Sequence, residues 1–117
     1  MAHKICPTTH KAPPAPYYAV IFSSTLADDA EGYSTMADRM VALAKEQEGF
    51  LGVESAARTS EGFGITVSYW RDLESIRKWK AQSEHAVAQK MGRGAFYKNY
   101  RLRVARVERE CGFERDE

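Results

Sequence analysis

Residues 65–90 join a strand pattern directly to a helix pattern, and this junction constrains the fold more than any other stretch of the chain. From Ile65 to Trp70 an apolar set of residues alternates with a mixed set, which is the two-residue period of a β-strand. Asp72 follows, and a short carboxylate accepts hydrogen bonds from the free N–H groups of a first helical turn. The sequence therefore predicts a strand that passes into a helix with almost no loop.

The predicted helix that follows Asp72 carries one stripe of residues at helical spacing: Ile76, Trp79, Ser83, Val87 and Lys90. A helix packs such a stripe against its neighbours, so we expect Trp79 to face the sheet. Trp70 and Trp79 are the only tryptophans in the chain.

The rest of the chain supplies four more elements. Gly49 is expected to end the first helix, since glycine tolerates the left-handed conformation that closes a helix. Gly52 predicts a bulge or a close backbone approach in the strand that follows. The predicted elements are strands at residues 17–25, 50–58, 65–70 and 100–109, and helices at residues 33–47 and 73–90.

The order of these elements is strand, helix, strand, strand, helix, strand, with a hairpin between the two middle strands. Two βαβ crossovers around a central hairpin predict the ferredoxin-like βαββαβ fold. This fold belongs to the α+β class, and it has a four-stranded antiparallel sheet with both helices on one face.

The 117 residues are enough for one domain with a core of its own. Residues 1–16 contain all four prolines and few bulky apolar groups, so we expect a disordered or extended N-terminal arm. Residues 17–110 form the predicted domain, and residues 111–117 are expected to be a frayed C-terminal tail.

Composition argues against several partners. A formal net charge of +1 provides no strong field toward nucleic acid or a membrane, so we expect neither as a partner. No apolar run approaches the roughly 20 residues that span a bilayer, and no signal-peptide pattern is present, which predicts a soluble cytoplasmic protein.

Cys6 and Cys111 lack metal-site spacing and are expected to be free thiols. We expect no metal at His3 and His10.

The sheet has a second face that the helices would not cover. We take one set of residues in the last two strands to point to the helices, and the other set to point away. An uncovered amphiphilic face of this kind usually marks an interface, so we expect a homodimer through the sheet face that encloses pockets for small ligands. The set expected to face the helices is Ile65, Val67, Tyr69, Tyr100, Leu102 and Val104, and the set expected to face away is Thr66, Ser68, Trp70, Arg101, Arg103 and Ala105.

Four segments, PYYAVIFSS, QEGFLGVESA, GITVSYWRDLESIRKWKAQSEHAVAQ and FYKNYRLRVARVER, carry a family resemblance. Over roughly residues 17–109 the chain resembles the antibiotic biosynthesis monooxygenase domain family, in particular its small bacterial members. The resemblance implies a dimeric α+β barrel. It also implies one of two activities, because some members oxidise polycyclic aromatic substrates with O₂ and no metal or flavin, and others degrade haem.

His85 is the candidate general base, since it is the only histidine outside the arm. Nine residues at 100° per step place it about a half-turn from Ile76 on a continuous helix, which would expose it. Ser83 could cap a fresh helical segment after a kink and turn His85 inward. A surface or structural role for His85 is the alternative.

Six further residues are candidates for substrate binding. Most of them have a structural alternative. Trp79 could be a core residue, and Tyr97 and Asn99 could be polar residues of a turn before the last strand. The two arginines could be charges that flank an exposed edge of the sheet. Trp70 could stack on a flat substrate or rim the pocket. The six candidates are Trp70, Trp79, Tyr97, Asn99, Arg101 and Arg103.

These observations and the resemblance predict a cofactor-independent monooxygenase that oxidises a small aromatic or enolisable substrate with O₂. The residues would provide a dry aromatic pocket, a proton acceptor and donors for the anion. A non-catalytic dimeric domain for ligand binding or stress is one alternative. Haem degradation is another, but the place of the family's iron-ligating histidine is Gln89, a poor ligand, so His85 would have to substitute.

Overall fold

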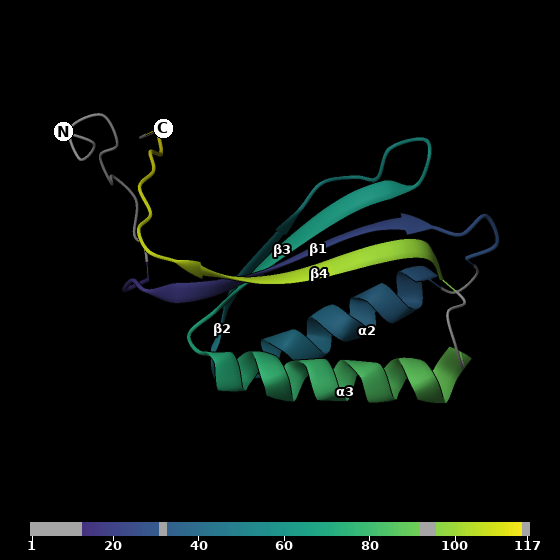
Figure 1. The fold of residues 1–117 in the computed structure, drawn as a ribbon, viewed down its shortest axis with the longest axis horizontal. Helices are drawn as coiled ribbons and strands as arrows, with labels where there is room; N and C mark the ends of the chain where they lie inside the picture. Colours follow the sequence, from purple (N-terminus) through teal and green to yellow (C-terminus); the bar gives the residue numbers. More distant parts are fainter. Residues whose placement is uncertain (1–12, 31–32, 92–95, 116–117) are drawn as a thin grey trace.

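The protein forms one antiparallel β-sheet with two helices on the same side of it (Figure 1). The computed structural model describes residues 13–30, 33–91 and 96–115, except for the side chains of residues 85–91. The order of elements is the predicted one. The elements are β1 (Tyr17–Leu26), α2 (Tyr33–Lys45), β2 (Phe50–Ser55), β3 (Phe63–Trp70), α3 (Leu73–Met91) and β4 (Tyr97–Val107).

The strands lie in the order β2-β3-β1-β4, and every neighbouring pair is antiparallel. This is the ferredoxin-like α+β arrangement that the sequence predicts. The register of β2 shifts between Phe50 and Gly52, which confirms the bulge expected at that glycine.

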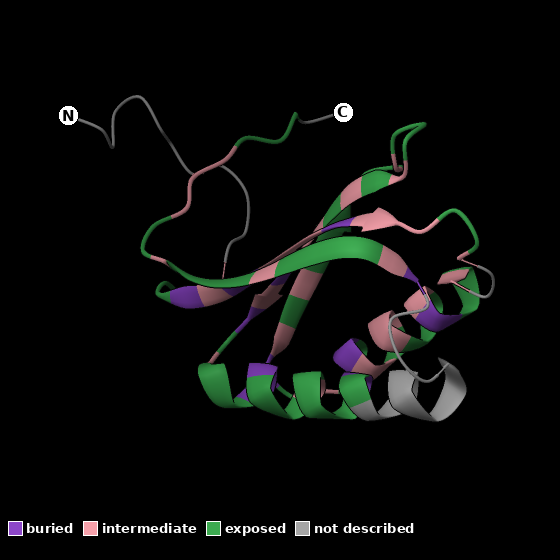
Figure 2. Ribbon diagram, turned by 45° about the vertical axis from the view of Figure 1, so that its right-hand side comes forward, coloured by how far each residue is buried: buried purple, intermediate pink, exposed green. Residues whose placement is uncertain are grey.

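The core lies where α2 and α3 meet the sheet, on the side of β3 (Figure 2). Val20, Ala44, Trp70 and Ile76 form its buried centre, and Trp70 is 0% exposed. Trp79 packs against this cluster, as its position on the helical stripe predicts. Tyr18, Phe50 and Leu102 complete the set.

The predicted orientation of β3 is wrong, whereas that of β4 is right. Trp70 is packed with residues of both helices, and the alternation of β3 therefore turns Ile65, Val67 and Tyr69 to the far face of the sheet. Leu102 faces the helices as expected. Both residue sets of β3 contain large apolar side chains, so alternation alone does not reveal the buried face. The space between the helices accommodates the indole of Trp70, the largest fully buried side chain.

The junction between β3 and α3 is as tight as predicted. The Ser75 N–H donates to Asp72 Oδ1 at 2.8 Å, so Asp72 caps α3. α3 continues through Ser83 as one helix, so the fresh helical segment that Ser83 could have capped does not form. Gly49 is not in the left-handed region. A Cβ atom there would lie 2.1 Å from Ser75 Oγ, so Gly49 is required for close approach of the chain to α3.

The two ends of the domain leave the sheet at one corner, because Tyr17 pairs with Val107 across β1 and β4. Cys111, just beyond this corner, is disulfide-bonded, so the expectation of a free thiol is wrong for it. Cys6 lies outside the described residues, as do His3 and His10. The start of β1 and the end of β4 are neighbours because the two strands pair antiparallel. The spacing of residues along the chain does not reveal that the two ends meet.

Candidate functional site

The helix-facing side of the sheet carries two aromatic clusters at opposite ends. We call the first the tryptophan end; it comprises Phe50, Ser68, Trp70 and Trp79. We call the second the tyrosine–arginine end; it comprises Phe22, Ser24, Tyr33, Arg58, Phe96, Tyr97 and Tyr100. Val20 and Leu102 lie between them on β1 and β4.

The tryptophan end is closely packed. The ring centroids of Trp70 and Trp79 are 5.3 Å apart, and Phe50 meets Trp70 edge to face at 5.4 Å. Trp70 Nε1 donates to Ser68 Oγ at 2.8 Å, and Trp79 Nε1 donates to the Met40 carbonyl at 3.0 Å. Both indole N–H groups are therefore satisfied inside the protein, and this end is part of the core.

The tyrosine–arginine end is built around Arg58, which lies on the loop between β2 and β3. Its Nη1 atom donates to the carbonyls of Ser24 at 3.1 Å and Gly62 at 2.7 Å. Its Nη2 atom donates to Ser24 Oγ at 2.9 Å and to the Tyr33 hydroxyl at 2.8 Å. The guanidinium therefore ties the loop, β1 and the first residue of α2 together.

The Tyr33 ring lies 5.0 Å from the centre of this guanidinium and belongs to an aromatic cluster at the start of β4. Tyr97 contacts Phe22 at 5.4 Å, Tyr100 at 5.7 Å and Tyr33 at 5.9 Å between ring centroids. Burial, together with the charge and hydrogen bond of Tyr33, raises the pKa of Tyr97. Tyr97 is therefore a neutral hydroxyl at physiological pH and can act as a hydrogen-bond donor.

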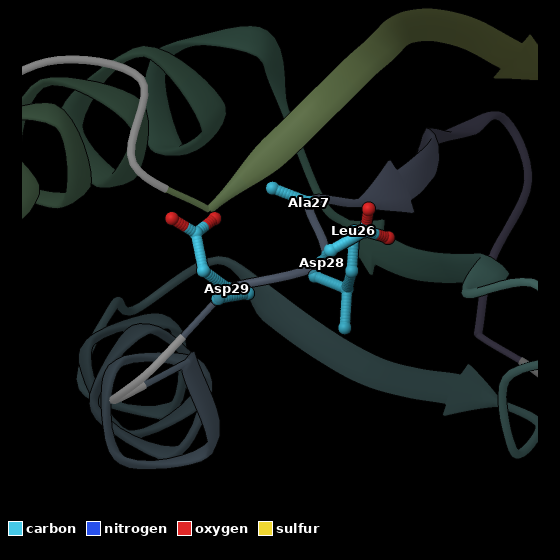
Figure 3. Close-up of a pocket in the computed structure, with 5 residues that line it drawn as sticks. Leu26, Ala27, Asp28 and Asp29 are labelled. Carbon is cyan, nitrogen blue, oxygen red and sulfur yellow. The ribbon is translucent and has the colours of Figure 1, made fainter.

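A pocket of about 470 Å³ opens at the same end of the sheet, on the loop between β1 and α2 (Figure 3). This loop leaves the sheet beside the start of β4, because Leu26 pairs with Tyr97 and the Ala27 N–H donates to the Phe96 carbonyl at 2.7 Å. Asp28 and Asp29 give the pocket an acidic rim, and Asp28 pairs with Lys98 at 3.4 Å.

Ser83 adds a polar atom to the inner face of α3. It lies one turn after Trp79, is 7% exposed, and its Oγ atom has no hydrogen-bond partner among the described residues. A buried hydroxyl usually has a partner, so Ser83 is available to a water or a ligand.

The structure divides the sequence-predicted site residues between the two faces of the sheet. Trp70, Trp79 and Tyr97 are on the helix side, whereas Asn99, Arg101 and Arg103 are exposed on the far face, paired with Thr25, Ser23 and Ile21 of β1. Tyr97 and Asn99 belong to β4, so their expected place in a loop is wrong. His85 lies on α3, and its side chain is outside the described set.

The far face has a groove of about 580 Å³, which is mainly apolar. Two tyrosine hydroxyls in it donate to carboxylates, Tyr69 to Glu54 at 2.7 Å and Tyr17 to Glu110. The hydrogen bond to Glu54 raises the pKa of Tyr69 to about 12, and burial raises that of Tyr17 to about 12. The groove is lined by Pro13, Tyr17, Ala19, Ile21, Leu51, Glu54, Val67, Tyr69, Ala105, Val107 and Glu110.

Tyr33 and Arg58 are not among the site residues expected from the sequence. Arg58 was expected at the end of a strand, whereas β2 ends at Ser55. One signal in the sequence was Gly64, because a side chain at that position would collide with the arginine. Among residues 13–30, 33–91 and 96–115, no group of three or more His, Cys, Asp or Glu could hold a metal ion. No helix in the same ranges is long and apolar enough to cross a membrane.

Relatives of the chain include proteins of known and unknown activity. A Bacillus subtilis protein described as uncharacterized protein YqjZ is 49% identical over 104 residues, which cover 89% of this chain and 90% of the relative. The jasmonate monooxygenase ABM of Pyricularia oryzae is 28% identical over 92 residues. That match covers 77% of this chain but only 43% of the fungal protein.

Solved structures share the fold. A mutant of SnoaB, a cofactor-independent oxygenase from Streptomyces nogalater, has a TM-score of 0.63 at 15% identity over 78% of this chain and 92% of that one. PA3566 from Pseudomonas aeruginosa has a TM-score of 0.62 at 19% identity over 84% and 98%. The family profile of the antibiotic biosynthesis monooxygenases matches residues 16–91, most of the chain. The chain therefore belongs to the antibiotic biosynthesis monooxygenase family.

Proposed function

We propose that this protein is a cofactor-independent monooxygenase that oxidises a small aromatic or enolisable substrate with O₂. The observation that carries the proposal is the tyrosine–arginine end. It combines aromatic rings with a guanidinium and neutral tyrosine hydroxyls, on the side of the sheet that faces the helices. Aromatic walls suit a flat substrate, and the cation and hydroxyls suit the anion that such a substrate forms.

The reaction would start with removal of a proton from a phenol or enol to a protein base. The substrate anion then transfers one electron to O₂, and the resulting radical and superoxide combine to a peroxide anion, which takes the proton back from the base. Loss of water leaves a carbonyl, so one oxygen atom enters the substrate and the other becomes water. The substrate itself supplies all the electrons, which is why no flavin or metal is required.

We assign the base to His85, and one wall of the site to Tyr97. α3 runs toward the end of the sheet where β4 begins (Figure 1), and position 85 belongs to the second half of α3. On the unbroken helix this residue is about a half-turn from Ile76. The assignment therefore requires a substrate that approaches from the side of α3.

Oxygen consumption with a panel of anthrones and naphthols tests the activity. The wild-type protein, purified without added metal or flavin, should consume one O₂ for each product formed. His85→Ala should lower kcat by about 100-fold or more, the usual contribution of a positioned base. Glu84→Ala is the matched control, since Glu84 is an exposed neighbour on α3 that pairs only with Lys80 among the described residues.

The same panel separates the alternatives. An aromatic compound that raises Tm without any O₂ consumption would replace the proposed activity with simple ligand binding. Turnover that appears only after haem is added, with a Soret band that His85→Ala removes, would replace it with haem degradation. Equal turnover by His85→Ala and the wild type would remove His85 from the mechanism.

We also propose that the far face of the sheet is covered by a second copy of this chain. Ile65 and Phe63 are 46% and 42% exposed there, and the groove between Tyr17 and Tyr69 is mainly apolar. Apolar surface of this kind favours an interface. A homodimer would pair the two sheets and leave the helix-facing site of each protomer separate.

Sedimentation tests this arrangement. Ile65→Asp should convert a dimer to a monomer, because a carboxylate would be placed in the apolar contact. Leu73→Asp is the control, since Leu73 is 54% exposed but lies on α3. A wild-type protein that sediments as a monomer at micromolar concentration would contradict the proposal.

A further inference from the structure

The guanidinium of Arg58 has no acidic partner in the part of the chain that the structure describes. Its donors go to two carbonyls and two hydroxyls, all of them neutral. By contrast, Arg71 pairs with Asp72 and Arg77 pairs with Glu74. A partly buried cation without a counterion is costly unless its surroundings or a ligand compensate its charge.

The residues around Arg58 fix the position of its guanidinium. A Cβ atom on Gly64 would lie 2.9 Å from Arg58 Cγ and 3.1 Å from Nη1, so the arginine lies where only glycine leaves room. Ser24, which accepts from Nη2, is 1% exposed. The Gly62 carbonyl that accepts from Nη1 belongs to a residue with φ of 89°, a conformation that glycine adopts without strain.

We propose that Arg58 is a positioning residue that compensates the negative charge of a phenolate or enolate oxygen held by the hydroxyl of Tyr33, beside Tyr97. The inference rests on the proposed function, since it names the substrate class of the same site. All four Nη hydrogens of Arg58 are used within the protein, so its charge acts through the hydroxyls that it polarises.

The hydroxyl chemistry supports this arrangement. The Tyr33 oxygen accepts from Arg58, which leaves its own hydrogen free for another acceptor. Tyr97 stays protonated because burial and Tyr33 raise its pKa, although the charge of Arg58 acts in the opposite direction. Tyr100, the remaining titratable group of β4 in this cluster, contacts the ring of Tyr97 at 5.7 Å. Tyr97 and Tyr33 share one hydrogen bond, so the pair has one hydroxyl hydrogen left for a ligand. A neutral donor backed by a fixed cation favours an oxyanion over its protonated form.

Binding of 4-nitrophenol tests the inference without turnover. This compound absorbs strongly in the visible only as the phenolate, so its spectrum at one fixed pH reports the ratio of phenolate to phenol in the bound state. The measurement is made without O₂. It therefore reports anion binding whether or not the protein is an oxygenase, and the two proposals can fail separately.

The variants separate charge from structure. In the wild-type protein the phenolate ratio of bound 4-nitrophenol should exceed that in water by about tenfold, the low end for a nearby opposite charge. Arg58→Gln should remove that gain, and Arg58→Lys should restore part of it because it keeps the cation. Gly64→Ala should also reduce the gain, since its methyl group displaces the guanidinium. Arg77→Gln, which changes an exposed arginine on α3, should leave it unchanged.

Two results would overturn the inference. One is an equal phenolate ratio in the wild type and Arg58→Gln while Arg58→Gln lowers Tm, which would make Arg58 a staple for the loop between β2 and β3. The other is no binding of 4-nitrophenol at millimolar concentration. Partial recovery by Arg58→Lys would support a role for charge, because a lysine does not reproduce the four hydrogen bonds of the guanidinium.

Discussion

The two aromatic ends of the helix-facing surface use similar residues for different purposes. At the tryptophan end, large rings pack against each other and each polar atom of the two indoles has a partner in the protein. At the tyrosine–arginine end, an aromatic cluster lies beside a cation that has no carboxylate partner among the described residues. The tryptophan end therefore mainly stabilises the domain, whereas the tyrosine–arginine end is the one that we propose to bind an anion.

The largest expected effect is at the tryptophan end. Trp70→Ala should lower the free energy of unfolding by about 3–5 kcal/mol, because it removes a fully buried ring and leaves a cavity. Tyr100→Ala, at the other end, should cost less than about 1 kcal/mol, since Tyr100 is 59% exposed. Denaturant unfolding of both variants checks the contrast, and equal losses would contradict the division of roles.

A second expectation concerns Gly49, which approaches the first turn of α3. Gly49→Ala should cost about 1–3 kcal/mol, because the new methyl group would lie 2.1 Å from Ser75 Oγ and 2.7 Å from Ser75 Cβ. Adding Ser75→Gly removes both atoms and should recover part of the loss. A double-mutant cycle from denaturant unfolding measures this coupling, and additive losses would show that the clash is relieved elsewhere.

A pair of buried serines compares a hydroxyl that contacts Arg58 with one that has no partner among the described residues. Ser24→Ala should cost about 1–2 kcal/mol, because it removes a buried acceptor of Arg58. Ser83→Ala should change stability by less than about 0.5 kcal/mol, since its buried oxygen has no partner among the described residues. Thermal unfolding distinguishes the two. A large loss for Ser83→Ala would show that its hydroxyl is hydrogen-bonded in solution.

The smallest effect is a pH dependence at the start of α3. Hydrogen bonds from Ser75 hold the pKa of Asp72 at about 2, below the ordinary 3.8. A depressed pKa gives stability that is complete above the unfolded value and is lost as the pH falls toward the folded value. Asp72→Asn still accepts a hydrogen bond but does not titrate, so its Tm should fall less than that of the wild type between about pH 4 and pH 2. Parallel profiles would exclude this contribution.

The features that the sequence determined by itself are local. The order of the elements, the cap at Asp72, the bulge at Gly52 and the inward position of Trp79 each follow from a turn residue or a short period. These signals arise from backbone conformation and from burial of one stripe, and both act over a few residues.

The tertiary structure decided which face of β3 is buried and which residues meet. Tyr33, Arg58 and Tyr97 are far apart in the chain, and they come together because β1 lies between β3 and β4 while α2 begins above that end of the sheet. Trp70 faces inward because its ring fills the space between two helices. The hydrophobic pattern of the sequence indicates where strands and helices form. It does not indicate which distant segments touch, because that depends on side-chain volume and on the order of the strands in the sheet.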